Sequence, residues 1–237
     1  MSEKDGAGEM LILSLAGAVI VLTLAWLGAS VHGGVQLTDR LIVGVPLLAS
    51  FLLGMSMAVK PGWMRGLRKD AVHSDDVSPR QSPDRVRHGH HPDCVEFAPH
   101  TVRVGGKILC AGCTGLALGS VVSTAFVGFF IIIMPASMPL AVSVIMVAAG
   151  TLLVVASMLD SEWLNARGYA RLASNLVMPL GFFLVAVGLL EATGNVAYGL
   201  AGVLISLLWL DTRIRLSRRR HIRICNSCGE ACKSYLA

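Results

Sequence analysis

Residues 139–159 read PLAVSVIMVAAGTLLVVASML, a run without a single charged side chain. About 20 mostly apolar residues are needed for a helix to cross the roughly 30 Å hydrocarbon core of a bilayer. Backbone groups inside lipid must pair within their own segment, so such runs are predicted to be helices. Five further stretches have the same character, the last of them somewhat short: 10–31, 41–59, 114–134, 173–191 and 194–210. We therefore expect an all-α, polytopic membrane protein with about six transmembrane helices.

Composition agrees with this interpretation. The 237 residues are 54% hydrophobic and only 15% charged, with a mean hydropathy of +0.66, which excludes an ordinary soluble domain. The first apolar stretch is too long for a cleaved signal peptide, and the residues before it do not form a basic leader. We expect it to be a genuine transmembrane span.

The distribution of basic residues predicts the orientation. With six spans, all of the 20 Lys and Arg residues except Arg40 fall on one side of the membrane. Basic residues accumulate on the cytoplasmic side, so both termini are expected in the cytoplasm and the protein in the plasma membrane. The run from Arg213 to His221 directly follows the last span, where anionic headgroups attract basic side chains. This anchoring explains the high pI of about 9.1 without a nucleic-acid partner.

Four regions follow from these boundaries. Residues 1–59 hold two spans, 60–113 form a cytoplasmic loop, 114–210 hold four spans, and 211–237 form a basic cytoplasmic tail. The first half of the loop is polar, contains proline and lacks periodicity, which is typical of a flexible tether. In its second half, Gly105 and Gly106 separate two short apolar-containing runs, 102–104 and 107–109. That pattern predicts a two-residue β-hairpin turn.

The loop also carries a concentration of metal-ligand side chains. Cys110 and Cys113 have the spacing that lets two thiolates from one tight turn bind a single ion, and Cys94 offers a third. His91 and His100 each adjoin a proline that restricts the backbone, which makes them better candidates for the nitrogen ligand than His88 or His90. Mixed sulfur and nitrogen ligands favour zinc. The alternative is that the histidines are merely a solvated surface feature.

A second cluster lies in the tail. It comprises His221, Cys225, Cys228 and Cys232, one nitrogen and three sulfur ligands within a short stretch. Zinc is the favoured occupant, with an iron–sulfur cluster or metal-free redox thiols as alternatives. All six cysteines lie on the predicted cytoplasmic side, where disulfides are disfavoured. We expect two separate sites, because ligands close in sequence lose less loop-closure entropy on binding.

The loop motif resembles a known family. The stretch with Cys94, Phe97 and His100, followed by Gly105-Gly106 and by Cys110-Ala-Gly-Cys113-Thr-Gly leading into a span, resembles the prokaryotic membrane family named domain of unknown function 2085. The resemblance covers about 30 residues and the following helix, and it implies Cys94, Cys110 and Cys113 as the metal set. This chain departs from the family pattern in having His91-Pro-Asp-Cys94 upstream and Gly112 between the paired cysteines. The family implies no activity.

These observations favour a non-catalytic protein. We expect a scaffold or binding component that lies in the lipid bilayer, contacts anionic headgroups through its tail and offers zinc modules to a protein partner. One alternative is a thiol or metal redox protein that uses Cys110 and Cys113. Another is a metal-ion transporter or sensor, which the absence of ionisable residues at mid-depth of the spans disfavours. Gly115 and Gly119, at the start of the third span, are predicted to permit close helix packing.

Overall fold

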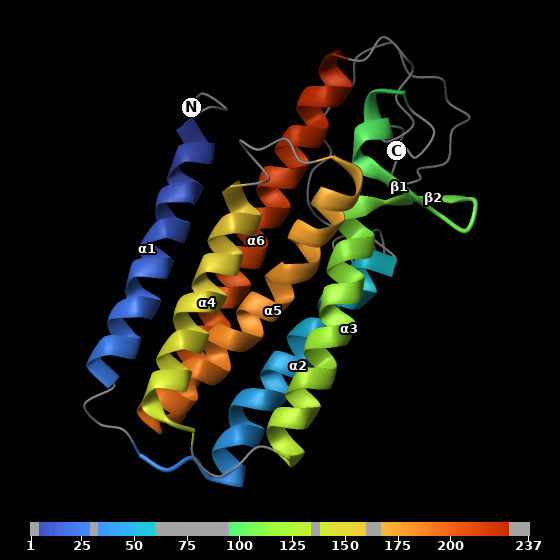
Figure 1. Ribbon diagram of the computed structural model, residues 1–237. Helices are drawn as coiled ribbons and strands as arrows, with labels where there is room; N and C mark the ends of the chain where they lie inside the picture. The colour runs from blue at the N-terminus through green and yellow to red at the C-terminus, as the bar shows by residue number, and fades with distance from the viewer. Residues whose placement is uncertain (1–4, 29–32, 60–94, 134–137, 160–166, 228–237) are drawn as a thin grey trace, which may run out of the picture.

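The protein is described by a computed structural model that covers residues 5–28, 33–59, 95–133, 138–159 and 167–227. Six helices in this part of the chain are long and apolar enough to cross a membrane, which confirms the predicted helical architecture and number of helices. Figure 1 shows them side by side in one bundle. Their bounds are α1 (Asp5–Gly28), α2 (Leu37–Val59), α3 (Ala111–Ile132), α4 (Leu140–Leu159), α5 (Gly168–Thr193) and α6 (Val196–Ser227).

Helix α5 is the centre of the bundle. In α5, 78% of the apolar membrane-length segment is buried inside the protein. The corresponding shares for the other five helices are 33–39%. It packs against α3, α4 and α6 along much of its length and also contacts α1 and α2. The outer helices expose large apolar side chains, such as Trp26 and Ile132. Such surfaces suit a lipid environment, and among the six described helices α5 is the most fully enclosed by protein.

Glycines allow the neighbouring helices to approach α5 at backbone distance. A Cβ atom added to Gly115 would lie 2.3 Å from the carbonyl oxygen of Leu172, and one added to Gly119 would lie 2.3 Å from that of Leu176. The close packing predicted for these two glycines is confirmed. Glycine also permits close packing on the opposite side of α5, because a Cβ on Gly150 of α4 would lie 2.7 Å from the carbonyl oxygen of Gly181.

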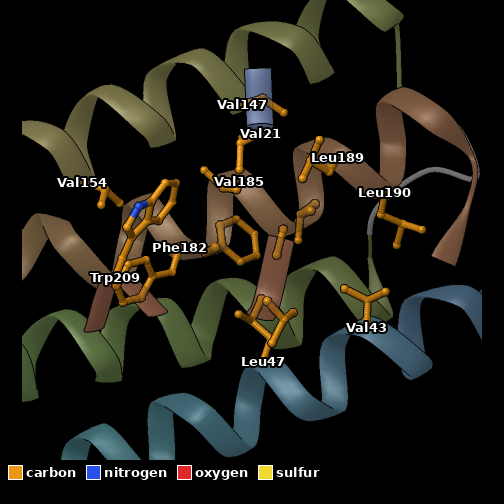
Figure 2. Packing of buried hydrophobic residues seen from close by; sticks show 14 of the residues in the cluster. Val21, Val43, Leu47, Val147, Val154, Phe182, Val185, Leu189, Leu190 and Trp209 are labelled. Carbon is orange, nitrogen blue, oxygen red and sulfur yellow. The ribbon is translucent and has the colours of Figure 1, made fainter. Parts of the chain in front are cut away.

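Buried apolar side chains of α1, α2, α3, α4 and α6 pack with those of α5 in one cluster, part of which Figure 2 shows. Val185 and Leu189 of α5 are fully buried, as is Trp209 of α6. The indole ring of Trp209 stacks on Phe182 with 6.5 Å between ring centroids, and its N–H donates to the Ser14 carbonyl of α1 at 3.0 Å. The buried Trp209 side chain, whose N–H is hydrogen-bonded, therefore connects α1, α5 and α6.

A short η3 helix (Val95–His100) leads into β1 (Thr101–Val104), which pairs antiparallel with β2 (Lys107–Cys110). Gly105 and Gly106 connect the strands with φ angles of 56° and 77°, a backbone that suits glycine in a two-residue turn. The predicted hairpin is confirmed. It lies beside the start of α5, where the hydroxyl of Tyr169 donates to the Arg103 carbonyl at 3.1 Å. We call this end of the bundle the hairpin end and the other the distal end.

Several helices extend past the predicted spans. Helix α6 continues beyond residue 210 as far as Ser227, so the first part of the predicted tail is helical. Arginine and leucine are good helix formers, and an Asp211–Arg215 pair of 2.7 Å at i,i+4 spacing supports this continuation. Helix α2 begins before Arg40 and α5 before Arg171, which draws both arginines into the bundle. The predicted tether lies outside the described residues.

The glycine contacts yield a direct test. We expect Gly119→Ala to destabilise the bundle by about 1–3 kcal/mol, because the new methyl group would collide with the α5 backbone, which cannot move aside cheaply. The measurement is thermal unfolding in detergent. Gly128→Ala is the matched control in the same helix, since nothing lies within 4 Å of its added Cβ. Equal unfolding temperatures for the two variants would contradict the packing described.

Candidate metal-binding site

The two loop thiols meet where the hairpin turns into α3. Cys110 is the last residue of β2 and the N-cap of α3, with extended backbone angles (φ −69°, ψ 118°), and Cys113 lies in the first helical turn. A side-chain hydrogen bond joins the two thiols, which are half-buried and not linked in a disulfide. Two adjacent soft ligands on a rigid junction can hold one edge of a tetrahedral metal site.

His100 lies at the end of η3 with its ring buried. Arg171 of α5 contacts it through Nη1, 2.5 Å from the imidazole Nδ1. An arginine can only donate, so Nδ1 accepts and the ring proton of neutral His100 is on Nε2. This contact attaches the hairpin module to the central helix. With Nδ1 engaged, ligation of a metal by His100 would require Nε2 to lose its proton.

The predicted loop site is described only in part. The structure brings Cys110 and Cys113 together and directs His100 to Arg171, while His91 and Cys94 lie outside the described residues. Within the described ranges, no three or more His, Cys, Asp or Glu side chains are grouped so as to share an ion. The four-ligand zinc site with Cys94 and an imidazole therefore stays a prediction.

The tail cluster begins on a helix. His221 and Cys225 fall in the last two turns of α6, four residues apart and so on one helix face, and their side chains are not described. Cys228 and Cys232 lie outside the described residues. A tail site would use two ligands from the end of α6 and two from the segment that follows.

A buried polar cluster that the sequence analysis missed lies beside the hairpin. Arg213 of α6 is 5% exposed and donates through Nη2 to Oδ1 of Asn175 at 3.2 Å, and the Asn175 amide donates to the Arg171 carbonyl at 2.7 Å. From its place after the last span, Arg213 was expected in a headgroup-facing run. Helical periodicity was the missed signal, because Arg213 is on the same face of α6 as buried Trp209 and Leu216, whereas Arg215 is exposed.

The distal end contains a buried ion pair that was also missed. Nη2 of Arg40 lies 3.7 Å from Oε1 of Glu191, and both side chains are almost completely buried. The Arg40 guanidinium lies 5.4 Å from the centre of the Phe130 ring, and Oε2 of Glu191 accepts the Met138 backbone N–H at 3.3 Å. The pair thus joins α2, α3 and α5 to the residues that precede α4. Each partner was predicted at or beyond a span boundary, and no local pattern indicates that Arg40 and Glu191 pair.

Compared with models of known protein families, with curated proteins and with solved structures, the chain matches none. The fold alone defines its class, a helical protein with six helices able to span a membrane.

The ion pair predicts a large difference between two carboxylates. Glu191→Gln removes one charge from a buried pair. It is expected to lower the free energy of unfolding by about 3–5 kcal/mol, because the Arg40 charge remains in a desolvated site. Asp211→Asn removes a charge from the exposed Asp211–Arg215 pair and is expected to lower the free energy of unfolding by only about 0–1 kcal/mol. Denaturant unfolding of both purified variants measures the difference. Equal losses of unfolding free energy in the two variants would show that burial does not determine how much each ion pair contributes to stability.

Proposed function

We propose that the protein is an integral membrane protein that holds zinc at its cytoplasmic face and serves as a scaffold or binding component rather than as an enzyme. The observation that carries this proposal is the contact between Cys110 and Cys113 at the start of α3. The hairpin, the η3 helix and the Arg171–His100 contact hold this junction against the bundle. A preorganised pair of thiols lowers the ordering cost of binding a metal.

The proposed loop site combines Cys94, Cys110 and Cys113 with one imidazole. Cys94 directly precedes η3, and Thr101 at the other end of η3 is the strand partner of Cys110. Only the six residues of η3 therefore separate Cys94 in sequence from the strand partner of Cys110. His91 is the preferred imidazole, because His100 already accepts a hydrogen bond from Arg171. The resemblance to domain of unknown function 2085 supports the same three cysteines.

A second zinc ion is proposed at His221, Cys225, Cys228 and Cys232. A closed set of four protein ligands is typical of structural rather than catalytic zinc. The basic residues that precede this cluster in α6 would keep it close to anionic lipid headgroups. Two closed zinc modules on one membrane face form a surface suited to a protein partner.

A dithiol redox function is the second candidate. One specific observation favours it: Cys110 is the N-cap and Cys113 is in the first turn of the same helix, the Cys-x-x-Cys arrangement of dithiol oxidoreductases. Such a protein would cycle between dithiol and disulfide by thiol–disulfide exchange with a partner's cysteines, which accept or supply the two electrons and two protons, instead of holding an ion. Quantitative thiol labelling of metal-free and metal-loaded protein separates the two functions, because zinc protects both thiols and a redox dithiol stays reactive.

Metal content tests the proposed function. We expect about two equivalents of zinc per chain in detergent-purified protein, and about one in Cys110→Ser and in Cys113→Ser, because loss of one thiolate opens the loop site. Zinc release on acidification is also expected, since protons compete with the metal for thiolate ligands. The measurement is elemental analysis by mass spectrometry.

Thr114→Ala is the control for that measurement, because it alters the next residue of the same helical turn without removing a thiol. It should keep both zinc ions. Wild-type zinc content in both cysteine variants would overturn the loop site. Iron in place of zinc would instead indicate an iron–sulfur cluster at the tail cysteines.

Topology provides an independent prediction. Reporter fusions placed after Lys69 and at Ala237 should both report a cytoplasmic location, because nearly all basic residues lie on that side of a six-span arrangement. A reporter that is active only outside the cytoplasm, at either position, would contradict the proposed orientation and place the thiols in an oxidising compartment.

A further inference from the structure

We propose that the β1–β2 hairpin docks on the surface of the lipid bilayer, with the face that carries Val104 and Leu109 against the acyl chains at the headgroup boundary. The hairpin then serves as an interfacial anchor beside the bundle. The proposal requires that the six helices span a bilayer, but it does not depend on zinc at the thiol pair.

The hairpin lies at the level where two of the apolar helices begin. Strand β2 ends at Cys110, and the apolar segment of α3 starts at the next residue, Ala111. The apolar segment of α5 starts at Gly168, and the neighbouring Tyr169 donates to the Arg103 carbonyl of the hairpin. Figure 1 shows the two strands projecting sideways from the bundle instead of continuing along the helices. A hairpin in this position extends along the membrane surface.

The strand register sorts the hairpin side chains into two faces. Val102 pairs with Leu109 and Val104 pairs with Lys107, so these four residues share one face. Val102, nearer the base of the hairpin, is 3% exposed, whereas Val104, nearer the turn, is 52% exposed. The face that is buried at the base therefore continues as exposed apolar surface toward the turn. Leu109 adds to this surface with 37% of its area exposed.

The surroundings of this apolar face are those of a membrane interface. Tyr169 is largely exposed beside the hairpin, and tyrosine is enriched where lipid meets water. Arg103 and Arg167 are exposed nearby and Lys107 adjoins the turn, so cationic groups are available to lipid phosphates. Apolar faces with basic polar neighbours are typical of amphipathic elements that lie in the interface. Since β2 runs directly into α3, whose Leu118 is exposed, the lipid around the bundle is the expected occupant.

Photocrosslinking in vesicles tests the proposal. Benzoylphenylalanine replaces one residue per variant, and the full chain is reconstituted into vesicles of phosphatidylcholine and phosphatidylglycerol. On irradiation this side chain attaches to nearby C–H bonds and not to water, so mass spectrometry detects attached phospholipid. We expect a phospholipid adduct at position 104. Hydrolysis of the lipid esters should leave a fatty acid on the chain, which shows that an acyl chain was in contact.

Positions 108 and 109 form a matched pair. Ile108 and Leu109 are adjacent and each 37% exposed, but they lie on opposite faces of the hairpin. The adduct at 109 should exceed that at 108 about tenfold, because successive side chains of a strand point to opposite faces. Position 121 is the positive control, since Val121 lies within the apolar segment of α3 and is 52% exposed, the same fraction as Val104.

Each outcome decides the proposal. Equal adducts at 108 and 109, or no fatty-acid adduct at 104 in vesicles where 121 is labelled, would overturn docking of the hairpin on lipid. Crosslinked dimers at 104 in place of lipid adducts would identify a second copy of the chain as the occupant and overturn it as well. Loss of the adduct at 121 would contradict a membrane-spanning bundle, and with it the proposal.

Discussion

The close backbone contact between α5 and its neighbours is the constraint on which the rest of the structure depends. In lipid, apolar side chains gain little by association, so helices adhere through packing and polar contacts. Gly115 and Gly119 on one side and Gly150 on the other bring α3 and α4 to within backbone contact of α5. This arrangement sets the position of both ends of α5. At its start lie Arg171 and Asn175, and near its end lies Glu191.

The polar residues at the two ends of α5 have different consequences. At the distal end, Glu191 pairs with Arg40 and accepts the backbone N–H of Met138, so one carboxylate connects three parts of the chain. At the hairpin end, Arg171 contacts His100 and Arg213 contacts Asn175. The hairpin and the thiol pair are therefore attached to the most deeply buried helix. A hairpin held in this way changes position only if the bundle itself rearranges.

The sequence predicted those features that local signals determine. The six spans follow from the length of apolar runs, the hairpin from Gly105-Gly106, and the close packing of α3 from Gly115 and Gly119. The helix ends were not predictable in this way, because charged residues conventionally mark the end of a span. Arg40, Arg171 and Arg213 are instead buried against partners supplied by other helices, and a single sequence does not reveal such tertiary contacts. Of the candidate metal site, only the proximity of Cys110 and Cys113 is described by the structure.

The proposed identity of the bound metal rests on this thiol pair, and X-ray absorption at the zinc edge tests it most directly. The measurement is made on a variant with Cys225, Cys228 and Cys232 replaced by Ser, so that only the loop site can hold zinc. If Cys110 and Cys113 both ligate zinc, its spectrum contains sulfur scatterers at about 2.3 Å, and replacing Cys110 as well by Ser removes the zinc or lowers the sulfur contribution. A spectrum with nitrogen and oxygen ligands alone, or zinc content and sulfur contribution both unchanged when Cys110 is replaced, would contradict zinc binding at the start of α3.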